Sequence, residues 1–280
     1  MTNFKKYIYH KQKELSIICH RGLWVKEKYP ENSISAIRNA VDSNFPIVEI
    51  DVRKNMNNDF FLMHDEDLIR TTNISGKISS ISSNEIKNAF LKKGNGEKNI
   101  LSNEKIPSLE EVLNTFRKDI LFDIDVKNES DRESLISFIH KNNYQEFVDV
   151  KKPLKNISEA KEYMDMEFQS KIIKMIVLNI TNQSMDEISQ IINLTDPEIV
   201  EINFSDVSVL REVLIICQKR DIAVWVNTLD DVPNGGFTDS FALKSPNKCW
   251  GSLISQGVSM IQSDHPSILK HWYESVFLAN

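Results

Sequence analysis

Short apolar runs rich in isoleucine, valine and phenylalanine recur along the chain, and segments of helical period lie between most of them. Each run has the length and the β-branched or aromatic content of a buried strand. Between the runs, as in 32–42 and 206–220, apolar residues fall on one helical face. This alternation favours a parallel sheet joined by right-handed helical crossovers. The predicted strands are 15–19, 46–52, 58–63, 120–126, 146–150, 172–178, 198–203, 222–227 and 258–262.

The run 58–63 follows 46–52 after a polar turn that is too short for a crossover helix, so we expect an antiparallel hairpin there. Eight strands then remain, and eight is the number of a (β/α)₈ TIM barrel. We therefore predict an α/β fold of this class, as a single domain over residues 1–280. A doubly wound open sheet is the alternative, but no glycine-rich phosphate-binding loop follows the first run.

Two segments differ from the regular alternation. Residues 66–107 are polar, and we expect an insertion after the second strand with one helix at 82–91. Residues 228–257 are expected to form a long loop, of the kind that often serves as a lid or a substrate wall. The spacing of Ser108 and Glu111 is that of a capping box, which predicts a helix beginning after Ser108.

Several predicted strands carry polar residues near their carboxyl ends, where the inside of a barrel is otherwise apolar. Glu49 and Asp51 are two residues apart and so point to the same side of their strand. In a (β/α)₈ barrel these strand ends meet at the face that carries the active site. The other polar positions of this kind are His20, Asp123, Asp125, Lys127, Glu201, Asn203, Asn227 and Asp264.

An acidic cluster at that position is costly unless its charge is matched. The usual partner of several carboxylates is one hard divalent cation, Mg²⁺ or Ca²⁺. For Glu49 and Asp51 alone, a solvated strand end with a salt bridge is the alternative. Glu201 lies at an inward strand position, where it can bind a substrate hydroxyl or pair with Lys151, Lys152 or Lys174. Trp225 is expected either to pack in the barrel or to form an apolar wall for the substrate.

Four short motifs follow one another in the first quarter of the chain. They are His20-Arg21-Gly22, Pro30-Glu31-Asn32-Ser33, Glu49-Ile50-Asp51 and Met63-His64-Asp65. Together they resemble the glycerophosphodiester phosphodiesterase family. The resemblance continues through 106–113 and 225–227 to the closing segment 257–266, and it covers the chain from about 16 to 272.

The resemblance implies a metal-dependent hydrolysis of glycerophosphodiesters to sn-glycerol 3-phosphate and an alcohol, on a TIM barrel with an insertion after the His-Asp motif. It implies that His20 is the general base and His64 the general acid. It also implies a single divalent cation, Mg²⁺ or Ca²⁺, on Glu49, Asp51 and Asp125. Substrate contacts are then expected from Arg21, Lys127, Glu201 and Trp225.

One feature favours a different reaction at the same site. The family's third metal ligand is most often Glu in a Glu-x-Lys strand, whereas this chain has Asp125-Val126-Lys127. That form is similar to the venom phospholipase-D branch, which cyclises its substrate. A lyase or phosphotransferase that forms a cyclic phosphate or a new diester is therefore the alternative. A binding protein that uses the pocket without chemistry is a third hypothesis.

The charge balance bears on the partners. The chain has 34 basic and 40 acidic residues, a net charge of −6, which is not the basic surplus of a nucleic-acid-binding protein. Three widely separated cysteines do not form a disulfide framework, and this favours a reducing compartment. The N-terminal segment lacks a signal-peptide core, and no apolar run suits a membrane anchor. We expect a cytoplasmic protein that acts on a small phosphodiester, with the oligomeric state left open.

Overall fold

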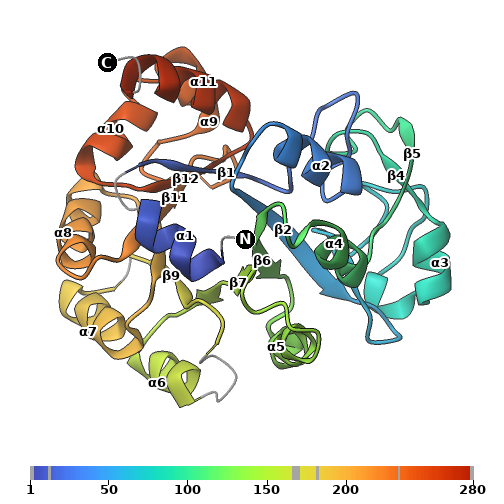
Figure 1. Cartoon of the computed structure of the whole chain (residues 1–280), viewed down its shortest axis with the longest axis horizontal. Coiled ribbons are helices and arrows are strands. Elements are labelled where there is room, and N and C mark those ends of the chain that lie inside the picture. The colour runs from blue at the N-terminus through green and yellow to red at the C-terminus, as the bar shows by residue number, and fades with distance from the viewer. Residues whose placement is uncertain (1–2, 12–13, 166–170, 181–182, 233, 278–280) are drawn as a thin grey trace. The chain divides into compact units, whose positions relative to one another are not determined.

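The computed structural model describes residues 3–11, 14–165, 171–180, 183–232 and 234–277. They belong to two compact units, a first unit of Cys19–Val148 and a second unit of Thr2–Ile18 with Asp149–Asn280. Figure 1 shows the helices and strands of both units. Within the described residues, no helix combines the length and the apolar content that crossing a bilayer requires.

The first unit is built on the neighbouring strands β2 and β6. Strands β1 (Ser16–Cys19) and β7 (Val148–Val150) have residues in both units. In chain order, the other elements of the first unit are α2 (Ile34–Asp42), β2 (Ile47–Lys54), β3 (Phe60–Leu62), η1 (Ile78–Ser80), α3 (Ser83–Asn88), β4 (Phe90–Lys92), β5 (Leu101–Lys105), α4 (Leu109–Phe116), β6 (Leu121–Val126), η2 (Glu129–Asp131) and α5 (Arg132–Lys141).

Strands β2 and β6 pair in parallel, in a register that runs from Ile47 opposite Leu121 to Val52 opposite Val126. All six residues of β2 in this stretch are buried, as is typical of a parallel strand covered on both faces. Strand β3 pairs antiparallel with the end of β2. The hairpin expected at 58–63 is therefore confirmed.

Helix α2 fixes the loop that precedes it. The Ser33 hydroxyl caps the helix by accepting a hydrogen bond from the Ala36 amide at 3.1 Å. Ala36, Ile37 and Ala40 form its buried face. Because the first turn is held in this way, the preceding Glu31 and Asn32 are placed at the end of β2, where the site described below lies.

Residues 66–107 have regular structure and share a hydrophobic cluster with Phe61 and Met63. The helix predicted at 82–91 appears as α3 and begins with a full capping box between Ser82 and Glu85, but it ends at Asn88, and Phe90 and Leu91 belong to β4 instead. The antiparallel pair β4–β5 was not predicted. That this segment is an insertion stays a prediction. The cluster consists of Phe61, Met63, Leu68, Ile78, Ile86, Ala89, Leu91 and Ile106.

At the start of α4, only the serine half of the expected capping box is found among the described contacts. The Ser108 hydroxyl accepts a hydrogen bond from the Glu111 amide at 3.2 Å. The helix begins at Leu109, so the predicted boundary after Ser108 is confirmed.

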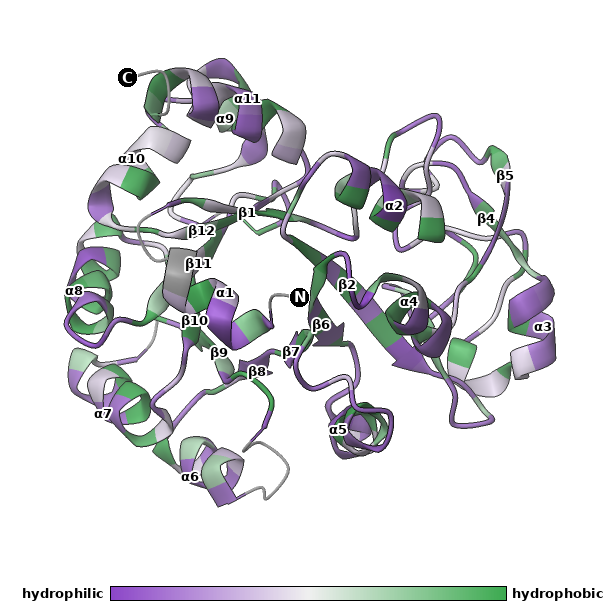
Figure 2. Ribbon diagram, viewed as in Figure 1, coloured by the Kyte–Doolittle hydropathy of each residue, from purple (hydrophilic) through white to green (hydrophobic). Residues whose placement is uncertain are grey.

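The second unit is a parallel sheet with strand order β1-β12-β11-β10-β9-β8. In Figure 1 the helices α6, α7, α8 and α10 lie in a row beside these strands. Figure 2 shows hydrophilic and hydrophobic residues mixed along α7 and α8, as in helices with one buried face. Its elements are α1 (Phe4–Lys11), β8 (Lys152–Pro153), α6 (Ile157–Asp165), β9 (Met175–Asn179), α7 (Met185–Thr195), β10 (Ile199–Asn203), α8 (Val207–Gln218), β11 (Ala223–Asn227), α9 (Asp239–Lys244), α10 (Trp250–Gln256), β12 (Met260–Ser263) and α11 (Pro266–Phe277).

The nine predicted strands all occur, as β1, β2, β3, β6, β7 and β9 to β12. The prediction of a long loop at 228–257 is wrong, because this segment contains helices α9 and α10. Both helices are short, at six and seven residues, so they give little periodic signal. Residue 233, which also falls in that prediction, lies outside the described residues.

Candidate active site

Three carboxylates meet at the carboxyl ends of β2 and β6. The register of the two strands places Asp51 directly opposite Asp125, and Glu49 opposite Asp123. One oxygen from each of Glu49, Asp51 and Asp125 lies within 4.8 Å of the others. The Glu49 and Asp51 residues are 2% and 0% exposed, so little water screens their charges. The three acidic residues predicted as metal ligands are therefore brought together.

Two cations lie against the Asp51 carboxylate. Lys127 Nζ is 2.6 Å from Asp51 Oδ1 and donates a hydrogen bond to Asp125 Oδ2 at 2.7 Å. Arg21 Nε is 3.1 Å from Asp51 Oδ2. Burial alone raises the pKa of Asp51, but the charges of Lys127 and Arg21 outweigh it and hold that pKa well below its usual range. The carboxylate is therefore ionised at any physiological pH.

The loop before α2 holds Asp51 in place. The Asn32 amide donates to Asp51 Oδ2 at 2.7 Å and accepts a hydrogen bond from the Asp51 backbone amide at 3.0 Å. Asn32 has a φ of 52° and Arg21 a φ of 55°, both in the left-handed region. The Arg21 backbone amide in turn donates to Glu49 Oε2 at 3.0 Å. Main-chain and amide groups thus fix the carboxylates of β2 before any ligand binds.

The two predicted catalytic histidines both lie near this cluster, and each acts electrostatically on Asp51. His20 follows β1, and its Nε2 atom is 4.0 Å from Glu49 Oε2. His64 follows β3, and its Nδ1 atom is 2.7 Å from Asp65 Oδ1. This contact orients the ring, so that Nε2 of His64 is the nitrogen available to a substrate. The side chain of His64 is 36% exposed and that of His20 is 14% exposed.

Burial lowers the pKa of His64 and is the largest influence on it. The nearby charges of Arg21 and Lys127 act in the same direction, whereas Asp51 and the Asp65 hydrogen bond oppose them. An anion bound beside the ring would also oppose them, because a negative charge favours the imidazolium form. Such an anion would therefore help His64 to carry a proton.

A second layer of charged residues surrounds these groups, and the sequence analysis gave it no role. Arg70 donates to both oxygens of Asp65, at 2.6 and 2.9 Å, and to Glu31 Oε1 at 2.7 Å. Arg21 Nη1 donates to both Glu31 oxygens at 3.1 Å. Burial raises the pKa of Asp65, but the hydrogen bonds and charges of Arg70 and His64 outweigh it and lower that pKa to about 2. The sequence motifs contain two of these residues, Glu31 and Asp65, and Arg70 follows the His64-Asp65 motif by five residues. This closeness to the motifs is the one sequence feature that could have identified them.

The donor set suits a hard divalent cation. Three carboxylates supply oxygen ligands and a formal charge of −3, and the two nearest cations, Arg21 and Lys127, reduce it to −1. A remaining negative charge in a buried site attracts a divalent ion, and oxygen donors favour Mg²⁺ or Ca²⁺. Asp125 is the most exposed of the three carboxylates, with 31% of its side chain accessible.

Glu201 and Trp225 belong to a buried, hydrogen-bonded group in the second unit. Asn227 donates to Glu201 Oε1 at 2.9 Å and accepts a hydrogen bond from Trp225 Nε1 at 2.6 Å. Lys151 Nζ is 3.7 Å from Glu201 Oε2, so the pairing with Lys151 that the sequence suggested is present. The expected binding of substrate by Glu201 and Trp225 stays a prediction.

Comparison with known proteins gives the family. Residues 20–207 match the sequence profile of the glycerophosphoryl diester phosphodiesterase family, and residues 174–273 match a domain of unknown function. A glycerophosphodiester phosphodiesterase of Caldanaerobacter subterraneus is 33% identical over 138 residues, which are 47% of this chain and 55% of that protein. The chain thus spans about half the length of the curated relatives it matches.

Solved structures show the same fold. A glycerophosphoryl diester phosphodiesterase from Parabacteroides distasonis has a TM-score of 0.80 at 22% identity, covering 100% of this chain and 94% of its own. A phosphodiesterase from Oleispira antarctica, in complex with the product sn-glycerol-3-phosphate, has a TM-score of 0.68 at 21% identity, covering 94% and 98%. The predicted α/β (β/α)₈ TIM-barrel fold class is confirmed. Since the family profile matches more than half of the sequence, the chain belongs to the glycerophosphoryl diester phosphodiesterase family.

Proposed function

We propose that the chain is a metal-dependent phosphodiesterase that hydrolyses glycerophosphodiesters to sn-glycerol 3-phosphate and an alcohol. The observation that carries the proposal is the meeting of Glu49, Asp51 and Asp125 within 4.8 Å, with both histidines near Asp51. The family supports the reaction class, and the product complex of the Oleispira antarctica phosphodiesterase supports the phosphate-bearing product.

In this proposal Glu49, Asp51 and Asp125 hold one Mg²⁺ or Ca²⁺ ion. When bound, the ion supplies positive charge against a non-bridging oxygen of the phosphodiester. Arg21 and Lys127, which already lie at the carboxylates, add positive charge to the same region. Arginine suits a bidentate contact to phosphate, and lysine acts as a point charge. These charges stabilise the negative charge that develops on phosphorus-bound oxygens in the transition state.

The two histidines move the protons. His20 accepts a proton from the attacking group, which is a water or a neighbouring hydroxyl of the substrate, as the new P–O bond forms. His64 donates a proton to the alcohol oxygen as the old P–O bond breaks. Where the substrate hydroxyl attacks, this step gives a cyclic phosphate, and water then opens it to the monoester. The His64 side chain is more exposed than that of His20, and Asp65 orients its ring. Both observations support the assignment of His64 as the acid that protonates the departing alcohol. General acid–base catalysis of this kind typically contributes about 10²–10⁴ in rate.

We also propose that the chain works in a reducing compartment such as the cytoplasm. Cys19, Cys217 and Cys249 are all buried. Burial raises the pKa values of Cys217 and Cys249 to about 12, which keeps them protonated and unreactive.

Phosphorus NMR of a turnover mixture tests the proposed reaction. We expect wild-type protein with Mg²⁺ or Ca²⁺ to convert a glycerophosphodiester into a linear phosphomonoester. His20→Ala and His64→Ala should each lose more than about 100-fold in rate with a melting temperature within a few degrees of wild type. A cyclic phosphate as the lasting product would instead support the lyase alternative. Equal turnover by the wild type and both variants would remove the histidines from the mechanism.

A further inference from the structure

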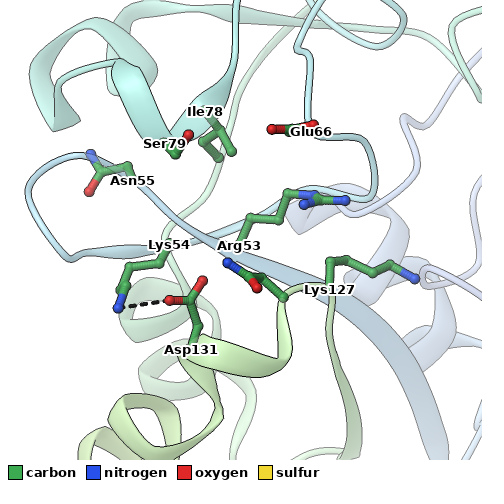
Figure 3. A pocket seen from close by; sticks show the side chains of 9 residues that line it. Arg53, Lys54, Asn55, Glu66, Ile78, Ser79, Lys127 and Asp131 are labelled. Atoms are coloured by element: carbon green, nitrogen blue, oxygen red, sulfur yellow. Dashed lines mark ion pairs between the residues drawn. The ribbon is translucent and has the colours of Figure 1, made fainter.

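A cavity of about 500 Å³ lies in the first unit beside the candidate active site. Its walls come from the end of β2, the loop after His64, the short helix η1 and the segment after β6. Figure 3 shows the side chains that line it. The volume lies within the usual range of small-molecule sites, about 300–1,000 Å³.

Two side chains connect this cavity to the candidate site. Lys127 lines the cavity and also contacts Asp51 and Asp125. Arg53 lines it as well, and its Nε atom donates a hydrogen bond to the backbone oxygen of His64 at 2.8 Å. Arg53 is two residues beyond Asp51 on β2, so it projects on the same side of the strand as Glu49 and Asp51. The cavity therefore begins on the His64 side of the site.

The ionic contacts of the lining leave one charge unmatched. Lys54 pairs with Asp131 at 2.8 Å, and Glu66 pairs with Lys77 at 2.9 Å. Lys127 pairs with Asp51 and Asp125. Within the described part of the chain, the Arg53 guanidinium has a backbone carbonyl as partner but no carboxylate. Its two terminal nitrogens keep the fork of donors that suits a carboxylate or a phosphate.

The other lining side chains are mostly uncharged and polar or already paired. Asn55, Ser79 and Asn128 are polar, and Ile78 is the one apolar residue among those that line the cavity. No aromatic ring is among them, although aromatic faces are the usual means of binding a quaternary ammonium group such as that of choline. In Figure 3 the Arg53 and Lys127 side chains extend in the same direction, whereas Lys54 points to Asp131.

We propose that this cavity holds the alcohol moiety of the substrate, and that Arg53 selects an alcohol with a negative charge of its own. The inference rests on the proposed function, in which His64 gives a proton to the departing alcohol. That alcohol must then lie on the His64 side of the candidate site, where Arg53 donates its hydrogen bond to the backbone oxygen of His64. The preferred substrates are glycerophosphodiesters whose alcohol carries a carboxylate or a second phosphate, and Arg53 is a specificity-determining residue.

A matched series of substrates tests this inference. The alcohols are glycerol, glycerate, glycerol phosphate and choline, each esterified to glycerol phosphate, so that charge changes while the reacting bond stays the same. For wild-type protein we expect kcat/KM for the glycerate and glycerol phosphate esters to exceed that of the glycerol ester by about 10-fold or more, with choline lowest. A charge-assisted hydrogen bond corresponds to about a 10- to 100-fold effect.

Arg53→Gln should lower kcat/KM for the two anionic esters by about 10- to 100-fold, and for the glycerol and choline esters by less than about threefold. Arg53→Lys should keep part of the anionic preference, because it retains the charge and loses only the fork. Lys26→Gln removes an exposed charge that pairs with Glu97 in the same unit, outside the cavity, and should change none of the ratios. Glycerate and glycerol phosphate together distinguish a carboxylate from a phosphate site.

Two results would overturn the inference. One is a wild-type preference for the choline or glycerol ester. The other is an equal loss for all four esters in Arg53→Gln, which would mean that Arg53 only positions the His64 backbone. Absence of turnover with every ester in the presence of metal would contradict the proposed function itself, and the inference with it.

Discussion

Asp51 in the first unit and Asp239 in the second are both almost fully buried carboxyl groups, at 0% and 1% exposure, but their pKa values are shifted in opposite directions. Lys127 and Arg21 contact Asp51 and hold its pKa well below the usual range. Asp239 accepts hydrogen bonds from the Thr228 hydroxyl at 2.6 Å, the Ser263 hydroxyl at 2.8 Å and the Asp264 amide at 2.7 Å. Burial outweighs these hydrogen bonds and raises the pKa of Asp239 to about 6.

The difference shows that burial does not by itself decide the state of a carboxyl group. Uncharged donors only partly offset the loss of water, whereas two full positive charges more than compensate for it. Uncharged donors suit a carboxyl group that ties segments together, since Asp239 on α9 joins the ends of β11 and β12. Two neighbouring positive charges, as at Asp51, suit a carboxylate that must stay ionised to hold a cation.

The largest effect is expected for Asp51→Asn. Loss of this carboxylate from the proposed metal site should lower kcat/KM by more than about 100-fold. That is more than the about 10- to 100-fold cost of losing a residue that only hydrogen-bonds to a metal ligand. It should also lower the free energy of unfolding by about 3 kcal/mol, because Lys127 and Arg21 lose a buried counter-charge. Steady-state kinetics and denaturant unfolding measure both. Asp239→Asn is the matched control and should keep kcat/KM within about threefold of wild type; an equal loss in the two variants would contradict the comparison.

Arg70→Gln is expected to have the next largest effect. Arg70 contacts no predicted ligand directly, but it holds both Asp65 and Glu31 and through them His64 and Arg21. Removing such an outer partner typically costs about 10- to 100-fold in activity or metal affinity. We expect this loss mainly in kcat, with the Arg70→Lys variant restoring only part of it because lysine lacks the fork. An unchanged kcat would show that the outer layer is purely structural.

The pH dependence of stability tests Asp239. Folding raises its pKa from 3.8 to about 6, which corresponds to about 3 kcal/mol at about 1.4 kcal/mol per pKa unit. Folding therefore favours the protonated form. This contribution is fully present below pH 3.8 and is lost as the pH rises through about 6.

Denaturant unfolding at several pH values between 4 and 7 measures this contribution as the difference between wild type and Asp239→Asn. The wild type should lose stability relative to the variant over that range, since asparagine does not titrate. A difference that is constant with pH would show that Asp239 is ionised throughout.

The smallest effect is expected for Glu201→Gln. Glutamine can keep the hydrogen bond from Asn227 but removes the charge opposite Lys151, which is 9% exposed in its side chain. A stability loss of about 2 kcal/mol follows from leaving a nearly buried cation without its carboxylate. If Glu201 also binds substrate, KM should rise at an unchanged kcat. Unaltered stability and unaltered KM together would remove Glu201 from both roles.

The sequence predicted most of the fold because the strands that form the parallel sheets are continuous apolar runs, and burial on both faces leaves a local signal. The strands it missed do not have this property. Strand β4 (Phe90–Lys92) has three residues, β5 (Leu101–Lys105) is largely polar, and β8 (Lys152–Pro153) has two residues. Helices α9 and α10 are shorter than two turns, so periodicity could not show them.

The candidate site was predictable to the extent that its residues are arranged by strand alternation and short motifs. Glu49 and Asp51 are two residues apart on one strand, which fixes a common side. The outer layer could not be derived in the same way. Arg70 meets Glu31 across 39 residues of chain, and no local pattern indicates that contact. The charge state of Asp239 likewise depends on donors from two other strand ends.

Calorimetric titration with Mg²⁺ or Ca²⁺ tests most directly whether Glu49, Asp51 and Asp125 bind one cation together. The wild type and Asp239→Asn should each bind one ion per chain with the same affinity, because Asp239 lies outside the acidic group. Asp125→Asn should bind the ion at least about 10-fold more weakly. If the ion does not bind the wild type, or binds Asp125→Asn as tightly, the three carboxylates do not form a metal site.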